Sequence, residues 1–127
     1  MSSALTAASA CVVLSCGLIS PVFADSLAFG VWQRDTGSSR LQMAPCGDKV
    51  CGVIVRVRDR NSPTQVGMKV FYDAEPTRPN VWSGKAFNPE DGLTYAGEMA
   101  VVDDKLTATG CVLGKLICKT VYWNRHR

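Results

Sequence analysis

A chain of 127 residues has room for one domain. Its net charge of only +3 gives no electrostatic reason to expect binding to nucleic acid, which needs a concentrated positive surface. The sequence also lacks the Gly-x-Ser-x-Gly, glycine-rich phosphate-loop and His-Glu-x-x-His motifs of common hydrolases, nucleotide-binding proteins and zinc enzymes. The single histidine, His126, lies next to the C-terminal residue, where we expect fraying. We therefore expect neither an enzyme nor a bound cofactor.

Residues 1–24 are uncharged and largely apolar, and they end in a small-x-small sequence at residues 22–24. This pattern is typical of a secretory signal peptide. We expect cleavage after Ala24, which leaves a single domain over residues 25–127, periplasmic or secreted, without a stable membrane span. A retained anchor is the alternative, but the apolar run is short and broken by turn residues. Lipidation of Cys16 is disfavoured because the apolar run continues past it.

The expected mature chain is dominated by the two-residue alternation of β-strands. In its first half the expected strands span 29–34, 40–44, 51–58 and 66–72. Clusters of Gly, Ser, Asp and Pro separate them, as turns require. A loop bounded by prolines follows at 75–79.

In the second half the expected strands span 80–87, 93–101, 105–111 and 117–125. The clearest alternation is at 93–101, where Leu, Tyr, Gly, Met and Val share one face. Eight short antiparallel strands joined by hairpin turns predict an all-β domain, either an up-and-down barrel or a sandwich. We favour the barrel because closure removes exposed strand edges.

Four cysteines of the mature chain form two close pairs, Cys46/Cys51 and Cys111/Cys118. Export is the setting in which small domains form disulfides. Three pairings are possible, and we favour the local one because each pair brackets a turn-like segment. Each bridge would then staple a hairpin and contribute about 2 kcal/mol. A metal site built from the four thiolates is the alternative, but the spacings fit zinc poorly, and we expect no metal.

The first and last strands carry a matching pair of motifs, Gly30-Val31-Trp32 and Trp123-Asn124-Arg125. Glycine allows close backbone approach, and an indole beside it can close the floor of a small barrel. An arginine from the last strand can then lie over the ring face. We expect this contact to hold the two ends of the chain together.

Several motifs in chain order resemble a known family. They are Gly30-x-Trp32, Ala44–Asp48 with Cys51-Gly52, Val66–Met68, Gly84–Tyr95 and Trp123–Arg125. The series is similar to the bacterial envelope proteins grouped as domain of unknown function 2147. The resemblance implies an exported single-domain protein with a lipocalin-like (calycin) barrel, closed by Trp32 and Arg125. Cys111 and Cys118 stand where this family more often has aromatic residues or glycine, which indicates a stapled subgroup.

Two functions are compatible with such a barrel. The mouth is expected to be lined by Met68, Trp82, Phe87 and Tyr95, a set suited to a small apolar or amphipathic ligand. Alternatively these side chains simply fill the core, because an eight-stranded barrel has little interior space. The protein would then be a structural or interaction module whose loops, mainly 58–65 and 73–80, contact another envelope protein.

Two groups of charged residues have simpler interpretations than binding. Glu90, Asp91, Asp103 and Asp104 lie where turns use such side chains for their own backbone hydrogen bonds, so we expect no cation there. Arg56, Arg58 and Arg60 alternate along one strand and are expected to form a solvated outer face. An anionic partner for the arginines is the alternative.

Overall fold

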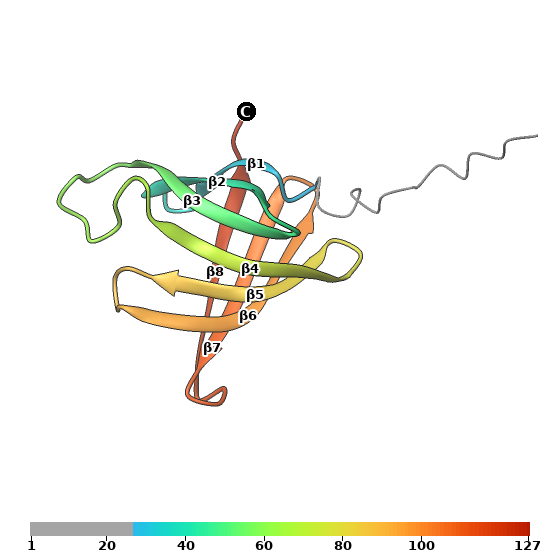
Figure 1. Ribbon diagram of the computed structural model, residues 1–127. Coiled ribbons are helices and arrows are strands. Elements are labelled where there is room, and N and C mark those ends of the chain that lie inside the picture. Colours follow the sequence, from blue (N-terminus) through green and yellow to red (C-terminus); the bar gives the residue numbers. More distant parts are fainter. Residues whose placement is uncertain (1–26) are drawn as a thin grey trace, which may run out of the picture.

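The computed structural model describes residues 27–127, so the predicted signal peptide over 1–24 lies outside the described residues. The described chain forms eight strands: β1 (Gly30–Arg34), β2 (Ser39–Cys46), β3 (Lys49–Val57), β4 (Lys69–Arg78), β5 (Val81–Asn88), β6 (Leu93–Val102), β7 (Lys105–Val112) and β8 (Ile117–Arg125). Each strand pairs with the next, and β1 pairs with β8, so the sheet closes into an up-and-down barrel (Figure 1). The predicted eight-stranded barrel is confirmed. Within residues 27–127 no helix is long and apolar enough to span a bilayer.

One expected loop is wrong. The segment 75–79 was predicted as a proline-bounded loop, but β4 continues to Arg78 and only residues 79–80 form the turn. The β4–β5 ladder is irregular there, with register shifts between Tyr72 and Glu75 and between Pro76 and Arg78. Proline is tolerated in a strand where the hydrogen-bond ladder is interrupted in this way.

One half of the barrel is filled by large side chains. Five side chains that come from four different strands are almost completely inaccessible to solvent: Trp32, Leu41, Met43, Trp82 and Leu106. This half contains the turns at 47–48, 79–80 and 103–104 as well as both ends of the described chain. We call it the closed end. The turns at 35–38, 89–92 and 113–116 and the loop at 58–68 lie at the opposite, open end.

At the closed end, Arg125 lies over the face of Trp32. The two residues are paired in the β1–β8 ladder, and the guanidinium carbon is 4.3 Å from the centroid of the indole. The same guanidinium donates hydrogen bonds to the carbonyl oxygens of Leu27 at 2.7 Å and Phe29 at 3.0 Å. The indole Nε1 donates to the carbonyl oxygen of Ala28 at 2.8 Å. The segment before β1 is therefore held under the barrel floor by both side chains.

The C-terminus is ordered, which corrects the expectation of fraying. The backbone amide of His126 donates to the carbonyl oxygen of Val31 at 2.9 Å. The guanidinium of Arg127 makes two hydrogen bonds of 3.0 Å to the carboxylate of Asp104. Arg127 is the main cause of the lowered pKa of Asp104, because its hydrogen bonds favour the charged carboxylate.

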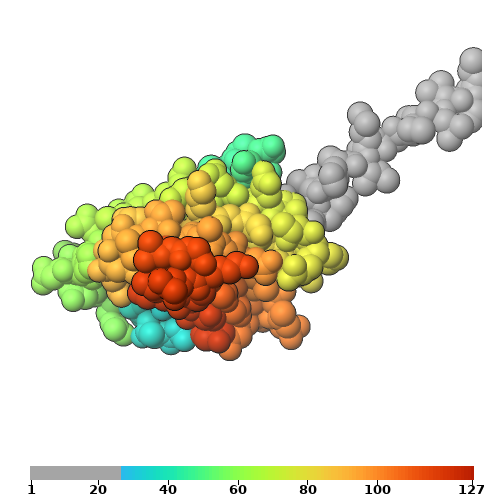
Figure 2. All heavy atoms as spheres, turned by 90° about the horizontal axis from the view of Figure 1, so that it is seen from below, coloured from blue at the N-terminus to red at the C-terminus, as the bar shows by residue number. Residues whose placement is uncertain are grey.

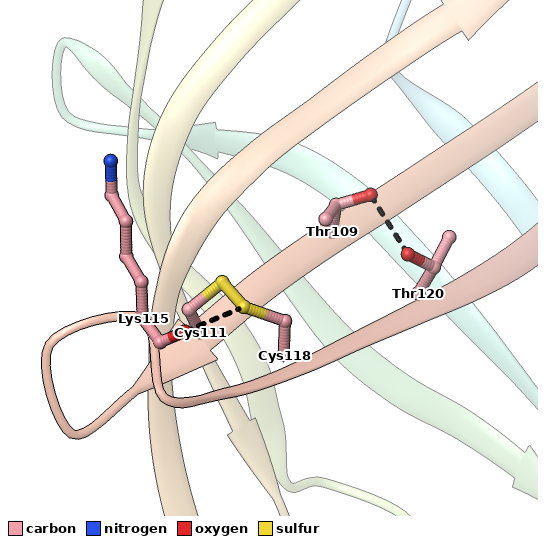
Figure 3. Close-up of a disulfide and its surroundings, with 5 residues drawn as sticks. All are labelled: Thr109, Cys111, Lys115, Cys118 and Thr120. Carbon is pink, nitrogen blue, oxygen red and sulfur yellow. Dashed lines mark hydrogen bonds between the residues drawn. A yellow bond between two sulfur atoms is a disulfide. The ribbon is translucent and has the colours of Figure 1, made fainter.

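Two disulfides staple hairpins, and the predicted local pairing is confirmed. Cys46–Cys51 closes the turn between β2 and β3, and Cys111–Cys118 joins β7 to β8 with Cα atoms 4.0 Å apart (Figure 3). The Cys118 sulfur lies 3.6 Å from the carbonyl oxygen of Lys115, a contact drawn as a dashed line in Figure 3. A disulfide sulfur carries no hydrogen, so this contact is not a hydrogen bond and does not fix the turn.

The second disulfide yields a stability prediction. Replacing Cys111 and Cys118 together by serine is expected to lower the free energy of unfolding by about 2 kcal/mol, because the bridge restricts a short loop in the unfolded chain. Urea denaturation of the double variant and of the oxidised wild type measures the difference. Identical midpoints would show that the bridge does not stabilise the fold.

The three arginines of the β3 region are exposed, as predicted. Strict alternation would place Ile54 on the same face as Arg56 and Arg58, but Ile54 is buried, because the β2–β3 ladder shifts register between the pairs Leu41–Ile54 and Arg40–Arg56. Arg58 donates to the carbonyl oxygen of Thr36 at 3.1 Å. Whether an anionic partner binds them stays a prediction.

Candidate functional site

The open half of the barrel contains a cavity of about 370 Å³. Its wall carries very small residues on four neighbouring strands. These are Ala74 on β4, Gly84 and Ala86 on β5, Gly97 on β6, and Ala108 and Gly110 on β7. An eight-stranded barrel is normally just wide enough for its side chains to fill it, so alanines at positions in its wall leave space. The three glycines instead allow close packing, because a Cβ atom at each would meet the backbone of a neighbouring strand or the Tyr95 side chain.

Buried apolar groups form the base of this cavity. Ile54, Phe71, Met99 and Trp123 all line it and all belong to the hydrophobic core. The rings of Phe71 and Trp123 meet edge to face, with centroids 6.2 Å apart and planes at 73°. Turn residues at the open end, including Ser38 and Pro89, surround the entrance. The cavity is therefore apolar at its base and more polar at its mouth.

An ionic cluster lies at the rim. The Asp91 carboxylate accepts hydrogen bonds from the Tyr95 hydroxyl at 2.5 Å and from Lys119 Nζ at 2.9 Å. Asp91 belongs to the β5–β6 turn and Lys119 to β8, so the cluster crosses over β7. Lys119 Nζ also lies 5.7 Å from the centroid of the Tyr95 ring.

These contacts shift the acidities of all three groups. The hydrogen bond from Tyr95, together with the Leu93 amide and Lys119, lowers the pKa of Asp91 to about 2 against a partial desolvation. The Asp91 carboxylate in turn raises the pKa of Lys119 and of Tyr95. The Asp91 side chain keeps 25% of its surface exposed, so solvent screens these interactions.

We expect the contribution of Asp91 to stability to depend on pH. Its pKa in the folded protein, about 2, lies below the ordinary value of 3.8, so the contribution is complete above about pH 4 and is lost as the pH falls through 2. The difference in free energy of unfolding between wild type and Asp91→Asn should therefore shrink as the pH is lowered from about 6 to about 2. Urea denaturation of both proteins at several pH values measures this difference in free energy of unfolding. A difference that stays constant would show that the carboxylate charge is not involved.

A second cation, Arg34, lies inside the barrel. It pairs with Trp123 in the β1–β8 ladder and so faces the same side of the sheet. Its guanidinium carbon is 5.6 Å from the centroid of the Trp123 ring, and both residues line the cavity. The nearest carboxylate is that of Asp35, whose Oδ1 is 3.5 Å from Arg34 Nε. Sequence reasoning did not single out Arg34 or Lys119. Arg34 is two residues from Trp32 and Lys119 is four residues from Trp123, and these even spacings place each cation on the same face of its strand as the tryptophan.

Of the four predicted ligand-contact residues, two line the cavity and two do not. Phe87 and Tyr95 line the cavity. Trp82 is fully buried beside its cross-strand partner Met99 and does not line it. Met68 precedes β4 and packs against the margin of the core, again outside the lining. A ligand-binding role for any of the four stays a prediction.

Of the four acidic turn residues, Asp91 makes the predicted hydrogen bond to its own turn, because its carboxylate accepts from the Leu93 amide at 2.9 Å. Asp104 instead pairs with the guanidinium of Arg127. No group of three or more His, Cys, Asp or Glu residues between 27 and 127 could hold a metal ion.

Comparison with known proteins agrees with this architecture. Among solved structures, the chain is similar to protein HP1028 of Helicobacter pylori, described as belonging to the lipocalin family. The TM-score is 0.60 at 18% sequence identity, and the match covers 77% of this chain and 82% of that one. No curated protein matches the sequence. Residues 30–125 match the family described as "Uncharacterized protein conserved in bacteria (DUF2147)". The chain therefore belongs to the DUF2147 family and has a lipocalin-like fold.

Proposed function

We propose that this protein is an exported, non-catalytic barrel that binds a small apolar or amphipathic ligand in its cavity. The observation that carries the proposal is the cavity of about 370 Å³, which falls within the usual range for small-molecule sites. Small residues from four strands line it, and buried aromatic and aliphatic groups form its base. Similar cavities inside barrels hold small ligands.

A specific surface feature favours a second candidate, an interaction module of the cell envelope. Leu113 and Leu116, at the tip of the β7–β8 hairpin, are 71% and 81% exposed, and Ile117 beside them is also exposed. Figure 2 shows this hairpin end at the front of the molecule, with the loop between β3 and β4 projecting at one side. Exposed apolar groups gathered in one place can contact another protein. The cavity makes ligand binding the better-supported function.

The test fills the cavity without changing the surface. In Ala86→Leu a larger side chain is placed among the cavity-lining residues, whereas the matched variant Ala96→Leu adds the same group to an exposed position on β6. Binding is followed by the fluorescence of N-phenyl-1-naphthylamine, a neutral apolar probe. We expect wild type and Ala96→Leu to bind it and Ala86→Leu to bind at least about tenfold more weakly. Equal binding by all three, or no binding by the wild type, would contradict the proposal.

Export is tested separately. Cells that express the full chain are fractionated. We expect the protein in the periplasmic or secreted fraction, with the mass of a chain that starts at Asp25. A cytoplasmic protein with the mass of the uncleaved chain would contradict export. Native mass spectrometry of the same material would show a ligand that copurifies.

A further inference from the structure

Two residues that line the cavity each carry a buried hydrogen-bond donor without an acceptor among the described residues. Trp123 is only 4% exposed, and its Nε1 is buried and makes no hydrogen bond within residues 27–127. The Nε of Arg34, on the paired position of β1, is buried and equally unsatisfied there. Buried donors nearly always have a partner, so two unsatisfied donors beside one cavity indicate an acceptor supplied from outside the chain.

The carboxylates near the cavity do not satisfy these donors. Asp35 lies 3.5 Å from Arg34 Nε, within ion-pair distance but outside hydrogen-bond geometry, and its side chain is exposed. Glu98 pairs with Arg78, and Asp91 pairs with Lys119. Glu90 is an exposed residue of the β5–β6 turn. The interior charge of Arg34 is thus poorly balanced by the protein itself.

The arrangement suits a carboxylate better than a neutral group. Arginine donates in a planar fork that matches the two oxygens of a carboxylate, and charge-assisted bonds of this kind are about twice as strong as neutral ones. Arg34 and Trp123 are adjacent, with the guanidinium carbon 5.6 Å from the indole centroid. Both side chains line the same cavity, so a single head group can be proposed as the partner of both donors. The apolar remainder of such a molecule would meet Phe71, Met99 and the small residues of the cavity.

We propose that the ligand is an acidic amphiphile, whose carboxylate is bound by Arg34 and by Trp123 Nε1 and whose apolar tail occupies the cavity. This inference rests on the proposed ligand-binding function and specifies the chemical class of the ligand. Arg34 and Trp123, which pair in the ladder that closes the barrel between β1 and β8, would then also bind the ligand.

The test compares three molecules that each contain an unbranched chain of ten carbons, with the carboxyl carbon counted in the acid: decanoate, decan-1-ol and the decyltrimethylammonium ion. Their affinities are measured at pH 7.5 by displacement of N-phenyl-1-naphthylamine. We expect decanoate to bind at least about tenfold more tightly than decan-1-ol and the cation to bind most weakly. Equal affinity for decanoate and decan-1-ol would overturn the anion site but leave the ligand-binding function standing. Failure of the wild type to bind the neutral probe, on which the displacement measurement depends, would overturn both.

Two variants locate the effect. Arg34→Met removes the charge and Trp123→Phe removes the Nε1 donor, while each keeps most of the apolar volume. We expect decanoate affinity to fall about 10- to 100-fold in Arg34→Met and about 3- to 10-fold in Trp123→Phe, with decan-1-ol changed by less than about twofold. The matched control Arg56→Gln removes the same charge from an exposed position outside the barrel and should change neither affinity. Equal losses for both molecules would overturn the assigned roles, and if either variant fails to fold, the head-group comparison on the wild type decides.

Discussion

Replacing Trp32 by alanine is expected to lower the free energy of unfolding by about 3–5 kcal/mol. The side chain is 0% exposed at the closed end of the barrel, so the variant leaves a cavity that the rigid floor cannot collapse to fill. It also removes the ring beneath the Arg125 guanidinium and the donor to the Ala28 carbonyl oxygen. Chemical denaturation of the purified protein measures the loss.

Trp32→Phe is the matched control for this prediction. Phenylalanine keeps an aromatic ring under Arg125 but lacks the Nε1 donor, so most of the packing survives and the Ala28 carbonyl oxygen loses its partner. We expect a loss of about 1–2 kcal/mol, clearly smaller than that of the alanine variant. A loss below about 1 kcal/mol for Trp32→Ala would mean that the barrel floor does not depend on this indole.

Replacing Gly97 by alanine is expected to destabilise the barrel by about 3 kcal/mol. A Cβ atom at this position would lie 2.6 Å from the Cα of Gly110 and closer still to the carbonyl oxygen of Thr109. Both atoms belong to the backbone of β7, so relief requires β6 and β7 to separate. Urea denaturation measures the loss, and thermal unfolding supplies an independent midpoint.

Gly52→Ala distinguishes backbone crowding from the general cost of adding a methyl group. Its Cβ would meet the sulfur of Met43 at 2.6 Å and the ring of Phe71 at 3.2 Å, which are side-chain atoms. Methionine is flexible and can change rotamer, so we expect a loss about half that of Gly97→Ala or less. Equal losses at both sites would contradict the special role of the β6–β7 approach.

Much of the barrel could be predicted because its signals are local. Strand periodicity is visible within single segments, and the cysteine pairs bracket turns of the kind that hairpins need. The fourth strand was the exception. Pro76 argued for a loop, and only the irregular β4–β5 ladder shows how a proline is accommodated within a strand.

The candidate site was less predictable because it depends on neighbours that are distant in sequence. Lys119 meets Asp91 across 28 positions, and no local pattern in either segment indicates this contact. Trp82 is an aromatic residue of the type that often contacts ligands, yet it is buried beside Met99. Arg34 was not predicted, because a charged side chain is not expected inside a barrel.

By itself, the sequence determined which side chains alternate between the two faces of the sheet, because successive residues of a strand point to opposite sides. It also showed that the expected strands at 93–101 and 105–111 each contain a glycine, Gly97 and Gly110. Only the tertiary structure decided that these glycines lie opposite each other, and Gly97 opposite Gly84, in the wall of the cavity. The physical reason is register: turn lengths and β-bulges set how far each strand is shifted against the next, and that shift decides which inward residues share a layer.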